Sequence, residues 1–262
     1  MPTAPPPTAL HRFDGKVVIV TGAGSGIGEG IAERFSQEGA SVVLAGRTRD
    51  KLDAVAARLP AGRTLVQVCD VSRWEQVQQL VDAAAQRFGG LDVMVNNAGI
   101  APSGSVTDVS LDDWQQTLAV NLSGVFHGSR AALPQLVQRG GCIVNVASVS
   151  GLAADWAMAA YNAAKGGVVN LTRQMALDYG RQGVRANAVC PSLTRSNMTE
   201  DMLQDADLMA RFMDRLPLGR AAEPADIAGV VAFLASDDAR FVNGVNLPVD
   251  GGVMASNGQP KM

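Results

Sequence analysis

The chain has 262 residues, of which 47% are apolar and 18% charged, a globular composition that excludes a disordered or collagen-like protein. Its 22 basic and 25 acidic side chains leave a formal charge of −3, so no general positive field is available for binding nucleic acid. Three isolated cysteines (Cys69, Cys142 and Cys190) and two histidines lack metal-site spacing, so we expect neither a metal nor a disulfide framework.

The two ends of the chain differ in composition from its middle. Residues 1–12 are rich in proline and threonine and are predicted to form a disordered lead, and residues 255–262 a loose polar tail. The start lacks the basic and apolar segments of a secretory signal, and no apolar run approaches the ~20 residues of a membrane span. We therefore expect a cytoplasmic protein without membrane contact, folded as a single domain over residues 13–254.

Short apolar runs alternate along the chain with longer amphipathic stretches. The predicted strands are 17–20, 42–44, 64–68, 93–95, 143–146, 184–189 and 245–249. Their continuous apolar character suits strands that are buried on both faces, as in a parallel sheet. Segments such as 28–38 and 74–88 lie between them; in the second, Val77, Leu80, Val81 and Ala84 recur at helical intervals.

This alternation of strands and helices favours an α/β fold. A barrel needs eight strand–helix units, and only seven strands are predicted. We therefore expect a Rossmann-like, doubly wound parallel sheet of about seven strands with helices on both faces. Such sheets bind ligands at the carboxyl ends of their strands, so chemistry is expected there.

The first predicted strand ends in a glycine-rich loop, and a helical pattern follows. Glycines let the backbone approach a pyrophosphate closely, and the start of a helix offers free N–H groups and the positive end of its dipole. A βα turn without a ligand is the plain alternative, but the position between strand and helix favours a dinucleotide site. The candidate residues are Gly22, Gly24, Ser25, Gly26, Ile27 and Gly28.

Tyr161 and Lys165 lie four residues apart and so share one face of a predicted helix. An ammonium near a phenol lowers the phenol pKa from ~10, which makes the tyrosine a usable general acid and base. Such pairs are also common on surfaces, but lysine is rare in this chain, with four lysines against eighteen arginines. Ser148 follows the predicted strand 142–146 and could hydrogen-bond a substrate oxygen, with Ser150 as its local competitor.

These motifs together resemble the short-chain dehydrogenase/reductase family from about Phe13 to Gly252. The resemblance implies a nicotinamide-dependent oxidoreductase that interconverts a hydrophobic secondary alcohol and a ketone. Each motif is weak alone, but their joint order and spacing are specific. The matching pieces are Thr21 to Gly28, Asp70-Val71, Asn96 to Gly99, Asn121, Ser148, Tyr161 with Lys165, the Pro191 turn and Pro248 to Gly252.

The resemblance also implies a role for each matching position. Tyr161 would exchange a proton with the substrate oxygen, Ser148 would hold that oxygen, and Lys165 would bind the nicotinamide ribose and lower the pKa of Tyr161. Asn121 would hold a water on a proton path from Lys165. The further implied cofactor positions are Asp70 and Val71 beside the adenine, Asn97 and Gly99 beside the adenosine ribose, and Pro191, Thr194 and Ser196 after the sixth strand.

The chain departs from the family pattern at Ser192, where glycine is usual, and at Ser196, where threonine is usual. The four-residue interval between tyrosine and lysine disfavours the enoyl-reductase branch. Two alternatives remain open. One is a 3-ketoacyl reductase that acts on carrier-protein or CoA thioesters, and the other is a non-catalytic dinucleotide-binding sensor, which is expected to have lost Ser148, Tyr161 or Lys165.

Cofactor choice is predicted from the end of the second strand. Gly46 stands where the family's NAD-dependent branch carries aspartate, and Arg47 follows it. Arginine can bind a 2′-phosphate, with Thr48 or Arg49 assisting. We favour NADP(H), and NAD(H) is the alternative if Arg47 only stacks on the adenine or faces water.

Two segments, 112–139 and 159–179, are predicted to be long helices rich in small and apolar residues. Such helices can be core on one side and a subunit interface on the other. The family resemblance implies a homotetramer built on them, and a monomer is the alternative.

Residues 191–217 are expected to cover the substrate. The segment leans acidic and contains Met198 and Met202, followed by Leu208, Met209, Phe212 and Met213 at helical intervals. Trp156 is predicted to add a second apolar wall. We expect a free hydrophobic ketone or alcohol of cyclic or aryl-alkyl size, rather than a sugar or a carrier-bound acyl group.

Overall fold

The computed structural model describes residues 11–257 and residue 259. Seven strands form one sheet, paired in parallel throughout, in the order β3-β2-β1-β4-β5-β6-β7. The strand order reverses direction between β1 and β4, which confirms the predicted doubly wound fold. The strands are β1 (Val17–Thr21), β2 (Ser41–Gly46), β3 (Thr64–Val68), β4 (Val93–Asn96), β5 (Cys142–Val146), β6 (Arg185–Pro191) and β7 (Asn246–Val249).

The central strands are buried along their whole length. Every residue of β1, β4 and β5 is buried, whereas the edge strands β3 and β7 are only partly covered. Ile19 of β1 lies in register with Val43 of β2 and Met94 of β4. Burial on both faces is the reason why these strands are apolar throughout and why the sequence shows them as continuous runs.

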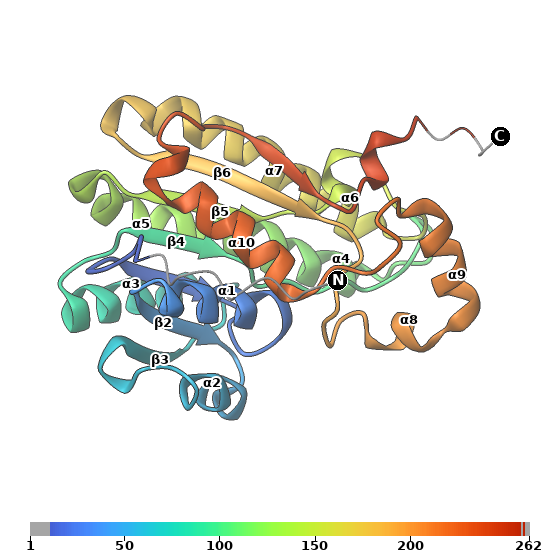
Figure 1. The fold of residues 1–262 in the computed structure, drawn as a ribbon. Helices are drawn as coiled ribbons and strands as arrows, with labels where there is room; N and C mark the ends of the chain where they lie inside the picture. Colours follow the sequence, from blue (N-terminus) through green and yellow to red (C-terminus); the bar gives the residue numbers. More distant parts are fainter. Residues whose placement is uncertain (1–10, 258, 260–262) are drawn as a thin grey trace.

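Helices cover both faces of the sheet (Figure 1). Side chains of α1, α2 and α10 pack with the strands in one core layer, and side chains of α3, α5 and α7 form the other. The helices are α1 (Gly26–Gln37), α2 (Arg49–Ala56), α3 (Trp74–Phe88), α4 (Leu111–Leu118), α5 (Gly124–Arg139), α6 (Val149–Leu152), α7 (Ala159–Tyr179), α8 (Glu200–Gln204), α9 (Ala206–Arg215) and α10 (Pro224–Ala235).

The long helix predicted over 112–139 contains an irregular turn. Residues Ala119–Ser123 form a π-helical turn between α4 and α5, and Asn121 within it is fully buried. Such turns widen the helix locally and occur frequently at functional sites. The helix predicted over 159–179 coincides with α7.

The N-terminal side of the domain is anchored at Arg12. Its guanidinium donates hydrogen bonds of 2.6 and 2.8 Å to the Glu38 carboxylate, and Phe13 packs against Phe35 with ring centroids 4.7 Å apart. The anchored chain thus begins at least one residue before the boundary predicted at residue 13. Residues 1–10 of the predicted lead, and residues 258 and 260–262 of the predicted tail, lie outside the described residues.

Candidate active site

A cavity of about 270 Å³ lies at the carboxyl ends of β1, β4, β5 and β6. This is the edge at which open α/β sheets bind ligands, next to the point where the strand order reverses. Segments far apart in the sequence meet here. The predicted site residues that line the cavity are Gly22, Ser25, Gly26, Ile27, Gly28, Asn97, Gly99, Ser148, Tyr161, Lys165, Pro191, Thr194, Ser196 and Met198.

The glycine-rich loop forms the floor beside β1. A Cβ at Gly28 would lie 2.2 Å from the Gly22 carbonyl oxygen. A Cβ at Gly26 would lie 2.8 Å from the Ser196 Cβ, and Gly26 also has a φ of +56°. Neither position accepts a side chain without displacement of the loop. Helix α1 starts directly after Ser25, whose side chain makes no capping bond. The first N–H groups of α1 are therefore left for an anion, which fits a dinucleotide pyrophosphate.

Thr21 joins the ends of β1 and β4 across the reversal point. Its hydroxyl donates to the Val95 carbonyl at 3.3 Å and accepts from the N–H groups of Asn97 and Ala98 at 2.9 and 3.1 Å. The Asn97 side chain donates back to the Thr21 carbonyl at 2.8 Å. These bonds fix the segment Asn97 to Gly99 beside the glycine-rich loop.

Lys165 lies beneath Tyr161 and is almost fully buried. Its Nζ donates to the Val146 carbonyl at 2.7 Å and lies 5.6 Å from the centroid of the Tyr161 ring. The side chain thus connects α7 to the end of β5. Burial lowers the pKa of Lys165 from 10.5 to about 8, because the charged ammonium loses its hydration.

Tyr161 has a raised pKa in this structure, against the lowering expected from Lys165. Burial is the main cause, and the negative charge of Asp155 adds to it, while a hydrogen bond with Ser148 opposes the rise. Lys165 is not among these causes, since its ammonium lies toward the face of the ring and donates to Val146; a lowering of the Tyr161 pKa by Lys165 stays a prediction.

Ser148 is buried at the start of α6, directly after β5. Its Oγ accepts from the Ser150 N–H at 3.1 Å and lies 2.9 Å from the Ser150 Oγ. Ser150, the competitor named from the sequence, is thus the direct neighbour of Ser148, and its hydroxyl donates to the carboxylate of Asp155. No sequence pattern pointed to Asp155.

The Asn121 side chain hydrogen-bonds to the backbone of Ile100. Its Oδ1 accepts from the Ile100 N–H at 2.9 Å, and its Nδ2 donates to the Ile100 carbonyl at 2.7 Å. The side chain therefore ties the π-helical turn to the segment that follows β4. Its role in holding a water stays a prediction.

Of the residues predicted for the adenosine end, Asn97 and Gly99 line the cavity, whereas Arg47, Asp70 and Val71 lie outside it. Arg47 is exposed at the end of β2, and Val71 is buried. Burial tends to raise the pKa of Asp70, but hydrogen bonds from Ser72 and the charge of Arg47 outweigh it and hold that pKa below its usual value. A Cβ on Gly24 would touch the Lys51 Cβ at 3.0 Å, so this lysine, which sequence reasoning missed, begins beside the glycine-rich loop.

The predicted substrate-covering segment contains α8 and α9, which lie at one end of the sheet (Figure 1). None of their residues is buried, and the apolar side chains of α9 are only partly covered. Met198 lines the cavity, whereas Met202 does not. Trp156 is 98% exposed and is not brought into the cavity.

The loop between β6 and α8 is held by a threonine that sequence reasoning missed. Thr199 Oγ1 donates to the Thr194 carbonyl at 2.6 Å and accepts from the Ser196 N–H at 3.1 Å. Both predicted residues are thereby fixed at the cavity wall. Threonines are common in loops, so the sequence offered no means of recognising this one.

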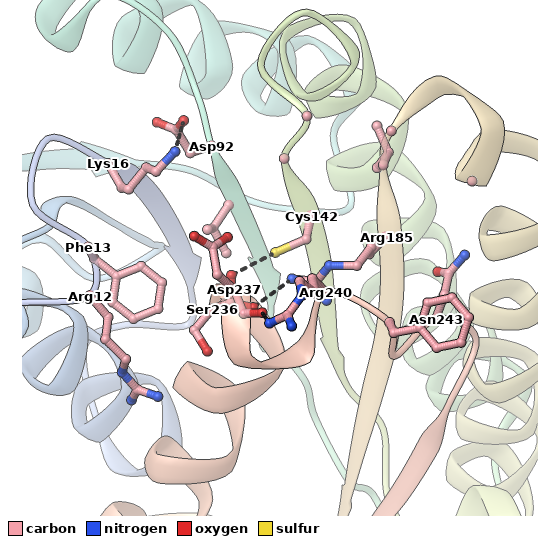
Figure 2. Close-up of a pocket in the computed structure, with 18 residues that line it drawn as sticks. Arg12, Phe13, Lys16, Asp92, Cys142, Arg185, Ser236, Asp237, Arg240 and Asn243 are labelled. Carbon is pink, nitrogen blue, oxygen red and sulfur yellow. Dashed lines mark hydrogen bonds and ion pairs between the residues drawn. The ribbon is translucent and has the colours of Figure 1, made fainter. Parts of the chain in front are cut away.

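A second cavity of about 600 Å³ lies at the opposite edge of the sheet (Figure 2). Lys16, Asp92, Cys142 and Arg185 line it at the amino ends of the strands. Lys16 pairs with Asp92 at 3.5 Å, and Arg185 donates to the Leu234 carbonyl near the end of α10 at 2.7 Å. The cavity contains none of the predicted site residues.

Two general properties follow from the described part of the chain. Residues 11–257 and 259 contain no group of three or more histidine, cysteine, aspartate or glutamate side chains placed to hold a metal ion. No helix among them combines the length and apolar character that crossing a bilayer needs.

Comparison with known proteins agrees with this geometry. The family model described as enoyl-(acyl carrier protein) reductase matches residues 22–254. The chain is 54% identical to meso-2,3-butanediol dehydrogenase of Serratia marcescens over 96% of this chain and 99% of the relative. The chain belongs to the short-chain dehydrogenase/reductase family. It is therefore an NAD(P)-dependent enzyme that interconverts a secondary alcohol and a ketone.

Other members of the family agree with this assignment. The chain is 37% identical to the 3-oxoacyl-[acyl-carrier-protein] reductase FabG of Thermotoga maritima, over 93% of this chain and 99% of that protein. The crystal structure of gox2181 superposes with a TM-score of 0.91 at 31% identity, covering 94% of this chain and 98% of the other. The predicted enzyme is thus confirmed over the alternative of a non-catalytic sensor.

Proposed function

We propose that the chain acts on a small free secondary alcohol that carries a neighbouring oxygen, such as meso-2,3-butanediol, and on the corresponding hydroxyketone. The convergence of Ser148, Tyr161 and Lys165 in one cavity beside the glycine-rich loop carries this proposal. The activity for which the Serratia relative is named supplies the substrate class. The cyclic or aryl-alkyl substrate expected from the sequence relied on the apolar residues of 191–217 and on Trp156 as a second wall, and the Trp156 side chain is exposed.

The chain's own residues divide the chemistry between them. A nicotinamide cofactor supplies the hydride acceptor or donor at this site. Tyr161 exchanges the proton of the substrate hydroxyl, and Ser148 hydrogen-bonds the same oxygen and fixes its position. Lys165 would hold the nicotinamide ribose. Gly22 to Gly28 and the start of α1 would hold the pyrophosphate, and Pro191, Thr194 and Ser196 would line the nicotinamide end.

A substrate panel tests the proposal. The catalytic efficiency of alcohol oxidation and ketone reduction is measured with 2,3-butanediol and acetoin, a cyclic ketone, an aryl-alkyl ketone and an acyl thioester. We expect the four-carbon pair to lead by at least about tenfold, because a site built to hydrogen-bond a hydroxyl discriminates against analogues that lack it. A thioester or an aryl-alkyl ketone with the highest efficiency contradicts the proposed substrate.

We further propose that NADP(H) is the preferred cofactor. Arg47 is exposed at the end of β2, and Lys51 begins beside Gly24, so two cations near the glycine-rich loop are available for a 2′-phosphate. Arg49, a second candidate for the 2′-phosphate, pairs with Asp53 at 2.9 Å.

That pair provides a matched control for the cofactor test. Arg47→Ala is expected to lower the efficiency with NADP(H) by about 10- to 100-fold, as for a lost hydrogen bond to a charged group, and to leave NAD(H) unaffected. Arg49→Ala is expected to change neither value by more than about twofold. A wild-type enzyme that prefers NAD(H) tenfold overturns the proposal.

The assembly and location of the protein are also proposals. We propose a cytoplasmic homotetramer built on the outer faces of α5 and α7, where Phe126 and Leu177 are 45% and 82% exposed. Light scattering tests the assembly, since a particle of one chain mass, 27.3 kDa, at micromolar concentration excludes the tetramer.

A further inference from the structure

A line of hydrogen bonds leads from Ser148 away from the glycine-rich loop. The Ser148 Oγ lies 2.9 Å from the Ser150 Oγ, and the Ser150 hydroxyl donates to the Asp155 carboxylate. Neither Ser150 nor Asp155 has a role in the proposed reaction. We call Asp155, Ser150 and Ser148 the serine relay.

The loop that carries Asp155 is fixed to the helix of Tyr161. Asn162, the next residue after Tyr161, donates from Nδ2 to the Asp155 carbonyl at 2.9 Å, and its Oδ1 accepts from the Asp155 N–H at 3.3 Å. The Ala157 carbonyl accepts from the Gly104 N–H at 2.7 Å, and Ala157 has a φ of +53°. An alanine in this region of φ is strained, so surrounding bonds must hold the loop in place.

The chemistry of the relay sets the direction of each proton. A carboxylate can only accept hydrogen bonds, so the Ser150 proton points to Asp155. The Ser148 proton then has two acceptors within reach, the Ser150 oxygen at 2.9 Å and the Pro191 carbonyl at 3.5 Å, and we assign it to the nearer one. With its proton on Ser150, Ser148 meets Tyr161 as an acceptor, which favours the neutral phenol, whereas a Ser148 that donates lowers the pKa of Tyr161. To stabilise a phenolate, Ser148 has to withdraw its proton from Ser150.

We propose that Asp155 and Ser150 are positioning residues that act through Ser148 to keep Tyr161 protonated, and so hold it ready as a proton donor. The charged and titratable groups around Tyr161 are consistent with this. Asp155 faces it from the loop before α7 and raises its pKa, Lys165 lies beneath the ring on α7, and the Cys190 thiol on β6 lies near Lys165. The inference rests on the proposed proton-transfer role of Tyr161.

The chain has two tyrosines, which permits a test without substrate. In a Tyr179→Phe background, the near-ultraviolet absorbance of the phenolate reports the titration of Tyr161 alone. Ser150→Ala retains the charge of Asp155 but breaks the relay. We expect it to raise the ionisation constant of Tyr161 about three- to tenfold, the range of one net hydrogen bond. Asp155→Asn is expected to shift the titration in the same direction, toward lower pH.

The matched control is a serine–aspartate pair elsewhere in the chain. Ser110 caps α4, and its hydroxyl lies 2.7 Å from the Asp113 carboxylate. Ser110→Ala is expected to leave the Tyr161 titration unchanged. The pH profile of alcohol oxidation provides a second readout, because oxidation requires the deprotonated tyrosine. Its midpoint is expected to move to lower pH in Ser150→Ala, whereas a purely structural defect lowers the rate at every pH without moving the midpoint.

The outcomes separate the inference from the proposed function. If Ser150→Ala leaves the Tyr161 titration in place, the relay is refuted, even if Asp155→Asn shifts it by loss of charge. If Tyr161→Phe retains turnover, the proposed function fails while the titration still tests the relay. A shift in both Ser150→Ala and Asp155→Asn, with none in Ser110→Ala, supports the proposal.

Discussion

Replacement of Lys165 provides a quantitative test of the electrostatics of the active site. The side chain is 4% exposed, and its Nζ donates to the Val146 carbonyl at 2.7 Å. Burial lowers its pKa from 10.5 to about 8. The folded protein thus holds an ammonium in a place that disfavours the charge. Lys165→Met removes the charge and keeps most of the volume.

The sign and size of the effect follow from proton linkage. Below pH 8 the lysine is protonated in both states, and burial of its charge costs about 3 kcal/mol, at 1.36 kcal/mol per pH unit between about 8 and 10.5. Between these two values the unfolded chain binds one more proton than the folded chain, so the free energy of unfolding of the wild type rises with pH. The variant lacks this rise.

We expect Lys165→Met to be more stable than the wild type at pH 7 by about 2 kcal/mol, after about 1 kcal/mol is subtracted for the lost bond to Val146. Near pH 10.5 the free energy of unfolding of Lys165→Met is expected to lie about 1 kcal/mol below that of the wild type. Turnover and cofactor affinity fall at every pH, since stability and activity oppose each other at such sites.

The assay is urea unfolding of both proteins from pH 7 to about 10.5, at one protein concentration because assembly contributes to stability. Other titrating groups are common to both proteins and cancel in the difference. Lys51→Met, which removes an exposed lysine from α2, is the control and is expected to show no such pH-dependent difference. A stability difference between Lys165→Met and the wild type that does not change with pH refutes the argument.

Three further predictions follow from the site and its surroundings. Tyr161→Phe removes the exchangeable proton and is expected to lower turnover at least ~100-fold with an unchanged circular dichroism spectrum; near-normal turnover contradicts its assigned role. Gly28→Ala places a Cβ 2.2 Å from the Gly22 carbonyl oxygen, so calorimetry is expected to show at least about tenfold weaker dinucleotide binding, and wild-type affinity argues against the loop as the pyrophosphate site. Asp92→Ala removes a buried carboxylate that accepts from the Val17 N–H at 2.9 Å, so the free energy of unfolding is expected to fall by about 2–4 kcal/mol while the KM for substrate stays the same. A changed KM would link the second cavity, at the amino ends of the strands, to catalysis.

Much of the fold could be predicted because its signals are local. The strands β1 and β5 are buried on both faces, so their apolar runs stand out without knowledge of their neighbours. The glycine-rich loop is recognisable because only glycine fits where a Cβ at Gly28 meets the Gly22 carbonyl. Tyr161 and Lys165 share a helix face by their spacing alone, and the cavity confirms that both point to the same place.

The tertiary structure decided what depends on the direction of side chains and on distant partners. The sequence around an apolar residue such as Trp156 does not show whether its side chain lies in a cavity or in solvent. In the folded chain the Trp156 side chain lies in solvent. Lys165 was expected to act on the phenol, and the fold also gives its ammonium an acceptor in the Val146 carbonyl at the end of β5. Asp155 reaches Ser150 only because Asn162 fixes its loop. The sequence by itself determined which elements form and which residues gather at one sheet edge, because backbone periodicity is local. The partners of each polar group at that edge were decided by packing, because a buried donor takes whichever acceptor the fold brings within reach.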